Sequence, residues 1–247
     1  MLLILWTWQK WPDSKLHVVF CDVGQGDASV IVLGSFQAVV DTGADEYKLT
    51  ACLSEAVPFW DKSIEVVFLS HSDKDHVKAL TGIKNRYSIG MMVDKPAAGD
   101  LIRYGSLSFD IFKGSELAVE KIMAGGSETN ESSVVMKMIY GNFSVLFTGD
   151  IDTASELALL EKSVLTKTDV LKVSHHGSKY GSTKEFLEKV SPGLAIISVG
   201  AKNSYGHPAG DTLGRILSVG AKILRTDKNG SIFVETDGIE TKVFTQR

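Results

Sequence analysis

The sequence lacks the marks of several large protein classes. Its 247 residues include only two cysteines, Cys21 and Cys52, and no CxxC pair, so we expect neither a cysteine-held zinc cluster nor a disulfide framework. Both cysteines stand among apolar residues and are predicted to be small buried side chains, with one disulfide between them as the alternative. A GxSxG nucleophile turn, a Walker loop and a GxGxxG fingerprint are absent, which argues against serine-hydrolase and nucleotide-binding folds.

Strong positive charge and long apolar runs are missing too. The formal net charge is -4, so a nucleic-acid interface over the whole surface is not expected, and a phosphate-bearing substrate would need local lysines or a metal ion. The apolar start "MLLILWTWQKW" is shorter than the roughly 20 residues that span a bilayer and has no signal-peptide pattern. It is interpreted as a buried first strand, an interfacial anchor or the end of a longer membrane segment.

The remaining pattern predicts one α/β domain. Hydrophobic residues make up 44% and charged residues 23%, as in ordinary globular proteins, and no linker divides the chain. Short β-branched segments dominate the first half, and helical and strand segments alternate in the second half. This order favours two packed sheets with helices outside, a four-layer αββα sandwich. We predict this domain over residues 16–247, preceded by an apolar N-terminal segment over residues 1–15.

Two histidines and two aspartates crowd the segment "HSDKDH", directly after the apolar run "IEVVFLS". Neighbouring carboxylates repel each other unless a cation lies between them. Imidazoles and carboxylates together suit zinc, manganese or iron. We predict that His71 and Asp73 bind one metal ion and that Asp75 and His76 bind a second. The alternative is a solvated helix start capped by Asp75.

Three further clusters follow later apolar segments. Asp150, directly after "VLFTG", is suited to bridging two ions; the alternative is a helix cap. His175 and His176 end the strand-like run "TDVLKVSHH", and one of them is expected to ligate a metal or donate a proton while the other orients it or packs. His207 in "YGHP" is a candidate ligand of the second ion, with a surface turn as the alternative. Five of the six histidines fall in the polar clusters, a concentration that favours a shared site.

The segments "DVGQGD" and "VVDTG" add aspartates near the chain start. The first is interpreted as a tight turn between strands, and Asp22 and Asp27 as residues that support the metal ligands. The second could suggest an aspartic protease, but that chemistry needs two such aspartates sharing a proton and no second motif is present. Asp41 is therefore predicted to support the metal loop.

Taken in order, these motifs resemble the metallo-β-lactamase fold superfamily. Its HxHxDH motif corresponds here to residues 71–76, and its "TGD" aspartate corresponds to Asp150. The segments "DVGQGDA", "VVDTG", "SHSDKDH", "NESSVV", "LFTGD", "LKVSHHGSKYGST" and "AIISVGAKNSYGHP" further resemble the C-terminal domain of the ComEC family, the DNA-uptake channels of naturally competent bacteria. This similarity extends over nearly the whole chain from about residue 16 onward.

Two positions depart from the superfamily pattern. Asp73 stands where a second histidine is usual. "ETNESS" lies where many members carry a metal-binding histidine, and Asn130, the nearest match, is placed among the supporting residues. Fewer imidazoles and more oxygens favour manganese over zinc.

The resemblance implies a nuclease on the outer face of a bacterial membrane that degrades the DNA strand not taken up. Two divalent ions, manganese or zinc, would activate a water molecule and neutralise phosphate charge, with Asp75 and one of His175 and His176 taking part in catalysis. DNA is then the substrate, and the membrane channel part of a ComEC-like protein is the expected partner.

Other interpretations remain open. Lys74, Lys179 and Lys202 adjoin the site loops and are expected to hold phosphates, with ordinary solvated charge as the alternative. The same scaffold also serves hydrolases of lactones, thioesters and phosphocholine esters, and fold alone does not choose among them. A metal-free binding domain is the third possibility, although the retained aspartates and histidines argue against it.

Overall fold

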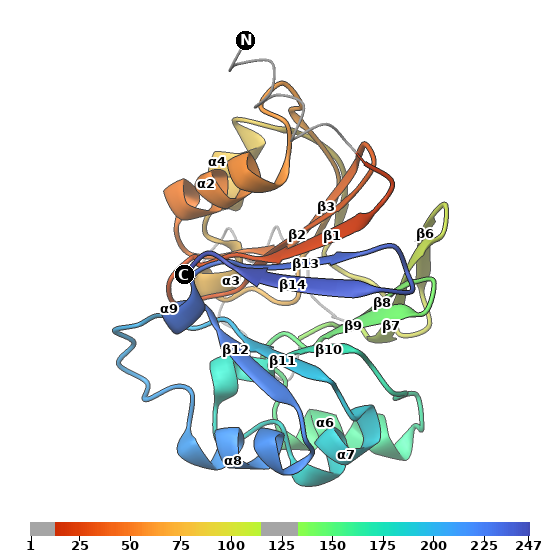
Figure 1. The fold of residues 1–247 in the computed structure, drawn as a ribbon, viewed down its shortest axis with the longest axis vertical. Coiled ribbons are helices and arrows are strands. Elements are labelled where there is room, and N and C mark those ends of the chain that lie inside the picture. The colour runs from red at the N-terminus through yellow and green to blue at the C-terminus, as the bar shows by residue number, and fades with distance from the viewer. Residues whose placement is uncertain (1–12, 115–132) are drawn as a thin grey trace.

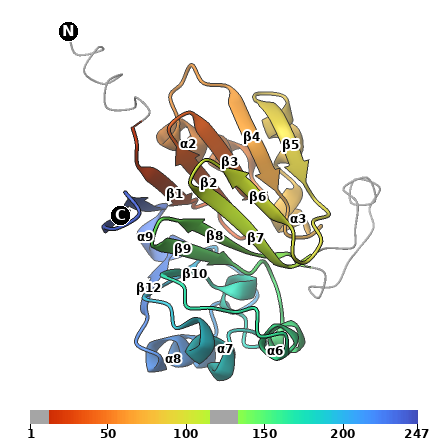
Figure 2. The same cartoon turned by 90° about the vertical axis from the view of Figure 1, so that its right-hand side faces the viewer.

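The structure is a computed structural model that describes residues 13–114 and 133–247. Two sheets of seven strands pack against each other, and helices cover their outer faces (Figures 1 and 2). The predicted four-layer αββα sandwich is confirmed. Asn130 and the apolar start over residues 1–12 lie outside the described residues, so their interpretations remain predictions. None of the helices formed by the described residues has both the length and the hydrophobicity of a transmembrane span.

The first sheet combines the N-terminal strands with the last two strands of the chain. Its order is β14 (Thr241–Thr245), β13 (Ile232–Thr236), β1 (Leu16–Phe20), β2 (Ala28–Leu33), β3 (Phe36–Thr42), β4 (Ser63–Phe68) and β5 (Ser88–Val93). Strands β3, β4 and β5 are parallel, and the other neighbours are antiparallel. Its outer face packs on α2 (Glu46–Ala56) and α4 (Leu80–Lys84), and the short α3 (Lys74–Val77) contacts β3.

The second sheet is built from the middle and the later part of the chain. Its order is β12 (Lys222–Arg225), β11 (Leu194–Ile197), β10 (Val170–Lys172), β9 (Phe143–Phe147), β8 (Val135–Tyr140), β7 (Leu107–Lys113) and β6 (Leu101–Tyr104). Strands β9 to β12 are parallel, and β6 to β9 are antiparallel. The outer face is covered by α6 (Thr153–Glu161), α7 (Lys184–Val190) and α8 (Gly210–Ser218), and α9 (Thr226–Asn229) leads from β12 back to the first sheet.

The main core lies between the two sheets. Alternate residues of each strand point inward, and Phe20 meets Phe147 while Phe68 meets Phe109, with ring centroids 6.1 and 4.7 Å apart. Each fully buried aromatic side chain of this size contributes about 1.5–3 kcal/mol through removal from water. This rigid core fixes the positions of the loops at the strand ends.

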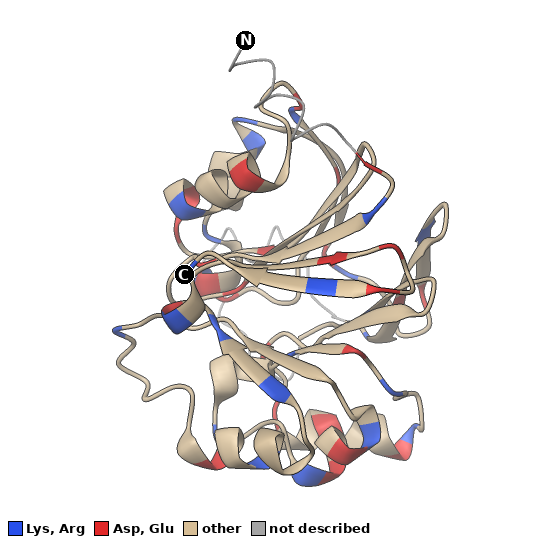
Figure 3. Ribbon diagram, in the orientation of Figure 1, with Lys and Arg blue, Asp and Glu red and all other residues tan. Residues whose placement is uncertain are grey.

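Parallel strands from both sheets bring their carboxyl ends to the same edge of the sandwich. The segments that follow β3, β4, β9 and β10 therefore meet there, and they carry the predicted histidines and aspartates. Such loops on a rigid scaffold are common places for active sites. Figure 3 shows Lys and Arg interspersed with Asp and Glu on the outer helices, as the small net charge leads one to expect.

Two local patterns of the sequence predict elements that the structure does not form, a single helix and a hairpin turn. The apolar spacing of "DHVKALTGIKNRY" predicts one helix, but the helix is interrupted, because the carbonyl of His76 accepts hydrogen bonds from Gly43 N at 3.2 Å and Thr42 Oγ1 at 3.0 Å, which tie α3 to the end of β3. The "NG" pair at residues 229–230 is not a hairpin turn. It ends α9, with Gly230 at φ 68°, and the flanking β12 and β13 belong to different sheets.

The two cysteines are joined in a disulfide, which corrects the prediction of two separate buried side chains. Cys21 follows β1 and Cys52 lies in α2, with their Cα atoms 5.9 Å apart. The pairing was hidden in the sequence because 31 positions separate the two residues, and only the packing of α2 on the first sheet brings them together. The bond anchors the start of the "DVGQGD" segment.

Removal of this disulfide is expected to lower stability without unfolding the sandwich. A cross-link that closes a loop of 31 residues is worth about 3–4 kcal/mol, mainly by restricting the unfolded chain. The double variant Cys21→Ala/Cys52→Ala should therefore unfold at lower urea concentration than the oxidised protein. Reductant should shift the wild-type curve in the same direction and leave the variant unchanged. Equal midpoints for oxidised and reduced wild type would contradict the expectation.

Candidate metal centre

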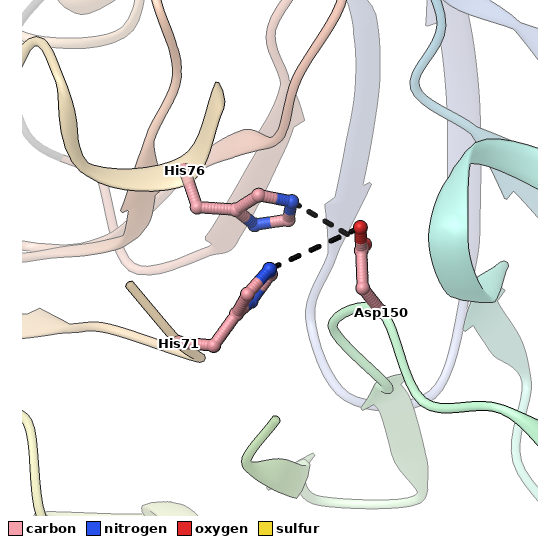
Figure 4. A group of neighbouring side chains, drawn as sticks. All are labelled: His71, His76 and Asp150. Carbon is pink, nitrogen blue, oxygen red and sulfur yellow. Dashed lines mark ion pairs between the residues drawn. The ribbon is translucent and has the colours of Figure 1, made fainter. Parts of the chain in front are cut away.

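Three side chains from distant parts of the chain point toward one another at the edge of the sandwich. His71 lies in the loop after β4, His76 in α3, and Asp150 in the loop after β9 (Figure 4). The Nε2 atom of His76 is 3.3 Å from Asp150 Oδ1, and that of His71 is 3.9 Å from Asp150 Oδ2. All three are buried, and they form one of four overlapping groups of potential metal ligands that occur among residues 13–114 and 133–247.

The unpaired atoms of this group fit a cation. His71 Nε2, His76 Nε2 and Asp150 Oδ1 are buried and, among the described residues, have no hydrogen-bond partner. Buried polar atoms are rarely left unpaired, since each costs about 1–3 kcal/mol. Two imidazole nitrogens and a carboxylate aimed at the same point are the donor set of a zinc, manganese or iron site. The residues present therefore fit a divalent ion.

Asp41, predicted from the sequence to support the metal loop, contacts His76. Its Oδ2 lies 2.9 Å from His76 Nδ1, so Nδ1 donates its proton to Asp41 and Nε2 is the ring nitrogen that faces Asp150. Ser70 extends this arrangement, because its hydroxyl donates to Asp41 Oδ2 at 2.7 Å and lies 2.9 Å from His71 Nδ1. A carboxylate behind a histidine fixes the ring and its tautomer in many metal sites.

His176 is held in a comparable way on the opposite side of the site. Its Nδ1 donates to the carbonyl of Ser198 at 2.9 Å, and its Nε2 is 3.1 Å from Asp75 Oδ2. The same Nε2 is 3.7 Å from Asp150 Oδ2. A nitrogen lone pair cannot face two carboxylates without a proton or a cation between them. Asp75 and His176 therefore extend the group of donors around Asp150.

A buried ion pair lies behind His176. Asp27 Oδ1 is 3.3 Å from His176 Nδ1, and Asp27 Oδ2 accepts a hydrogen bond of 2.5 Å from Lys172 Nζ. Lys172 also donates to the carbonyl of Val173 at 3.1 Å, and its side chain is only 3% exposed. Burial disfavours the Asp27 carboxylate, but Lys172 and His176 outweigh this and hold its pKa well below the usual value.

Glycine is required where the "DVGQGD" turn passes α3. Gly26 has φ 133°, and a Cβ there would lie 2.2 Å from the carbonyl oxygen of Asp75. The next amide, Asp27 N, donates to that same oxygen at 3.1 Å. Gly26 thus allows close approach to α3. The segment connects the antiparallel strands β1 and β2, which confirms the interpretation as a turn between strands.

Several residues of the site adopt strained backbone conformations. Asp41, His175 and His176 have φ angles of 57°, 47° and 53°, in the left-handed region that favours glycine. Such residues cost about 1–3 kcal/mol each and persist where surrounding contacts enforce them, often at functional sites. The turn through His175 and His176 separates their side chains, so that His176 is buried and His175 remains 28% exposed.

Two buried histidines of the site have raised pKa values. Burial lowers the pKa of both His76 and His176, but Asp150 outweighs it, helped by Asp41 for His76 and by Asp27 for His176. The pKa of His76 is raised well above its usual value, and that of His176 is raised to about 10. Burial likewise opposes the charge of Asp150, yet His76 and His176 keep its pKa well below normal.

These shifts predict a pH-dependent response to metal. The folded-state pKa of His176 lies above its unfolded value of about 6.5, so its proton stabilises the metal-free fold below about pH 6.5, and this contribution is lost as the pH rises through about 10. A metal ion binds only the deprotonated imidazole. The gain in melting temperature on adding Mn²⁺ or Zn²⁺ should therefore be larger at pH 8.5 than at pH 6, and calorimetry in two buffers at pH 7 should register released protons. Metal uptake without proton release would contradict this.

The remaining predicted ligands lie at the margin of the site. Asp73 is half-exposed, with Oδ2 3.7 Å from His71 Nε2. His175 Nε2 is 3.9 Å from Asp150 Oδ2. The ring of His207 is 5.5 Å from that of His175, and burial together with His175 and His176 lowers the His207 pKa. His207 thus stands outside the four groups of potential ligands found among the described residues.

Four other candidates are Asp22 and three lysines. Asp22 accepts hydrogen bonds from Arg247 at 2.8 Å and from Gly24 N at 3.3 Å, and it belongs to none of the groups of potential ligands among the described residues. The three lysines predicted to hold phosphates are exposed: Lys74, Lys179 and Lys202. Lys179 lies over the ring of Tyr180, 4.9 Å from its centroid.

Sequence reasoning missed Lys172, Ser70 and Ser198. Lys172 offered a signal, since it is the single charge between apolar residues in the strand "VLKV", where a buried lysine needs an acidic partner. The serines offered none, because a serine beside a histidine, as Ser70 is beside His71, is common in any loop, and Ser198 contributes only its backbone carbonyl, which any residue has.

The comparisons with known proteins agree with this geometry. Residues 21–201 match the family model of the Metallo-beta-lactamase superfamily. The chain belongs to this superfamily. The metallo-beta-lactamase fold protein YhfI from Bacillus subtilis has a similar structure, with a TM-score of 0.60, 11% identity and coverage of 90% of this chain and 100% of that chain. At such low identity this likeness concerns the fold alone.

The curated relatives include a protein named for competence and a protein of the ComE operon. The chain is 28% identical to ComE operon protein 3 of Bacillus subtilis over 263 residues, which covers 89% of this chain and 33% of that protein. It is 27% identical to competence protein ComA of Neisseria gonorrhoeae, with coverage of 90% and 32%. The chain thus spans about a third of the length of these relatives.

Proposed function

We propose that this chain is a metal-dependent nuclease that hydrolyses DNA phosphodiesters during competence DNA uptake. The observation that carries the proposal is the convergence of histidine Nε2 atoms from His71, His76 and His176 on the carboxylate of Asp150, within 3.9 Å or less. The similarity to competence proteins supports DNA as the substrate and a membrane channel as the partner.

His71, His76 and Asp150 would hold one divalent ion, manganese or zinc, so His76, which the sequence analysis assigned to the second ion, is proposed for the first instead, and Asp73 lies near enough to His71 to join it. Asp75 and His176 would serve a second ion, with Asp150 between the two. Bound ions of this kind activate water and neutralise charge on a phosphate. His175 is partly exposed at the margin of the site and is the proposed donor of a proton to the leaving oxygen.

The Cys21–Cys52 disulfide supports a position outside the cytoplasm. Disulfides persist in oxidising environments and are rare in the cytosol, where thiols stay reduced. A domain on the outer face of a bacterial membrane would meet incoming DNA before its transport. We therefore propose that the chain acts on that face, next to a membrane channel.

The test is cleavage of end-labelled single-stranded and duplex DNA with Mn²⁺, with Zn²⁺ and with EDTA. The wild type should cut in the presence of one of the metals and stop with EDTA. His71→Asn should lose at least a hundredfold in rate, since each lost factor of ten corresponds to about 1.4 kcal/mol and a metal ligand supplies several. His17→Asn is the matched control, because His17 lies on β1 and pairs with Asp13 instead.

The expected result is that the wild type and His17→Asn cut DNA in the presence of metal and that His71→Asn does not. A protein that binds the metals yet cuts neither form of DNA contradicts the nuclease. Lactones, thioesters and phosphocholine esters would then be the substrates to assay.

A further inference from the structure

We infer that two exposed tyrosines beside the metal centre, Tyr205 and Tyr180, are stacking positions for unpaired nucleobases, so that the site takes single-stranded nucleic acid. This inference rests on the proposed function and names the form of its substrate. The rings of Tyr205 and Tyr180 are 70% and 63% exposed. Both belong to loops that also carry candidate site histidines.

Tyr205 is linked to the metal centre through a series of rings. Its ring lies nearly parallel to that of His207, with an interplanar angle of 16° and centroids 5.9 Å apart. The His207 ring is in turn 5.5 Å from that of His175, whose Nε2 lies 3.9 Å from Asp150 Oδ2. A base on the outer face of Tyr205 would continue this series and bring its own phosphate chain toward the candidate ligands.

The loop that carries Tyr205 is built to hold it outward. The connection between β11 and α8 projects from the body of the molecule at the left of Figure 1. The side chain of Asn203 ties this loop: its Oδ1 accepts from Tyr205 N at 3.2 Å and His207 N at 3.0 Å, and its Nδ2 donates to the carbonyl of His207 at 2.8 Å. An exposed aromatic ring on a loop fixed in this way costs little entropy when it binds.

Tyr180 is held in a comparable way a few residues after His176. Its carbonyl accepts hydrogen bonds from both Thr153 N at 2.8 Å and Thr153 Oγ1 at 2.7 Å. Arg215 donates to the carbonyls on either side, Lys179 at 3.3 Å and Gly181 at 2.8 Å. Lys179 Nζ lies over the Tyr180 ring, so that a positive charge and an aromatic face are presented together.

Aromatic rings combined with nearby lysines are the features that bind single strands. Bases stack on such rings whatever their sequence, and lysines attract the phosphates. In a duplex the faces of the bases are already covered by their neighbours, and only an unpaired base can lie on a side chain. The two tyrosines therefore favour a single strand over a duplex.

The experiment measures binding apart from cleavage. Fluorescence anisotropy with EDTA present would compare a fluorescein-labelled 12-residue oligothymidylate with a duplex of equal length. Tyr205→Ala and Tyr180→Ala should each weaken binding of the single strand about five- to hundredfold, the loss expected for one stacked base. Tyr205→Phe should restore it, and the exposed Tyr47 on α2 supplies the control Tyr47→Ala.

A 2-aminopurine in the strand should lose fluorescence on binding to wild type and keep it with Tyr205→Ala. The inference is overturned if neither tyrosine variant changes the affinity for the single strand. It is also overturned if the duplex binds as tightly as the single strand, and in both cases this holds even if DNA is cut. If the single strand binds in a tyrosine-dependent way but is not cut with any metal, the stacking positions are supported. The proposed nuclease activity is then overturned instead.

Discussion

Replacement of Lys172 by methionine should destabilise the protein by about 3–5 kcal/mol, because it leaves the Asp27 carboxylate buried without its partner. Both side chains are nearly inaccessible, at 3% and 6% exposure, and Lys172 Nζ is 2.5 Å from Asp27 Oδ2. Methionine keeps most of the volume and the straight chain of lysine, so the loss reports the charge rather than a cavity. Urea unfolding of the metal-free protein measures it.

A double variant separates the ion pair from other effects. Lys172→Met/Asp27→Asn removes both charges, and its stability should recover much of the loss seen with Lys172→Met alone. If the stability losses of Lys172→Met and Asp27→Asn add up to the loss of the double variant, Lys172 and Asp27 do not act as a pair. The Asp27 side chain also lies 3.3 Å from His176 Nδ1, so metal uptake by Lys172→Met should fall as well.

Asp150→Asn should remove both the metal ion and the hydrolytic activity. Asp150 is the residue that the Nε2 atoms of His71, His76 and His176 face in common, at 3.9, 3.3 and 3.7 Å. An amide has the shape of the carboxylate but no charge, and it offers one weak ligand oxygen in place of two. Several kcal/mol of charge stabilisation would be lost, equivalent to about a thousandfold or more in rate.

The matched control for this variant lies two residues away. Asp152 caps α6 by accepting a hydrogen bond of 3.0 Å from Ser155 N, and it belongs to none of the ligand groups found among the described residues. Asp152→Asn should keep full metal content and rate, with a stability change of about 1 kcal/mol or less. Metal content by mass spectrometry and cleavage of a small phosphodiester provide the measurements. Equal metal content in Asp150→Asn and wild type would contradict the placement of the site.

Much of the fold was predictable from the sequence because its signals are local. The β-branched segments became strands, and "YKLTACLSEA" became α2, capped by Asp45, which accepts from the amides of Tyr47 and Lys48. The helix predicted after "HSDKDH" broke in two for a reason that is not local, namely the hydrogen bonds from Thr42 and Gly43 to the carbonyl of His76.

The candidate site was predictable in part for the same reason. Histidines and aspartates that directly follow apolar strands can be recognised by their position alone, and His71, His76 and Asp150 do meet. The distance of His207 from the ligand groups, and the pairing of Asp22 with Arg247, depend on loops whose paths the sequence does not reveal. Lys172 was overlooked because its partner Asp27 is 145 positions away.

Local patterns in the chain are enough to assign the protein to its class: the alternation of strands and helices, the polar clusters at the strand ends, and the motifs that belong to the metallo-β-lactamase superfamily. Three features depend on the folded arrangement: which donor atoms share one point, that Cys21 and Cys52 are bonded, and that Lys172 neutralises Asp27. The difference lies in the range of the interactions. Strand and helix propensity act between neighbours, whereas contacts such as that of Asp75 with His176, 101 positions apart, exist only once two sheets have packed and brought their strand ends to one edge.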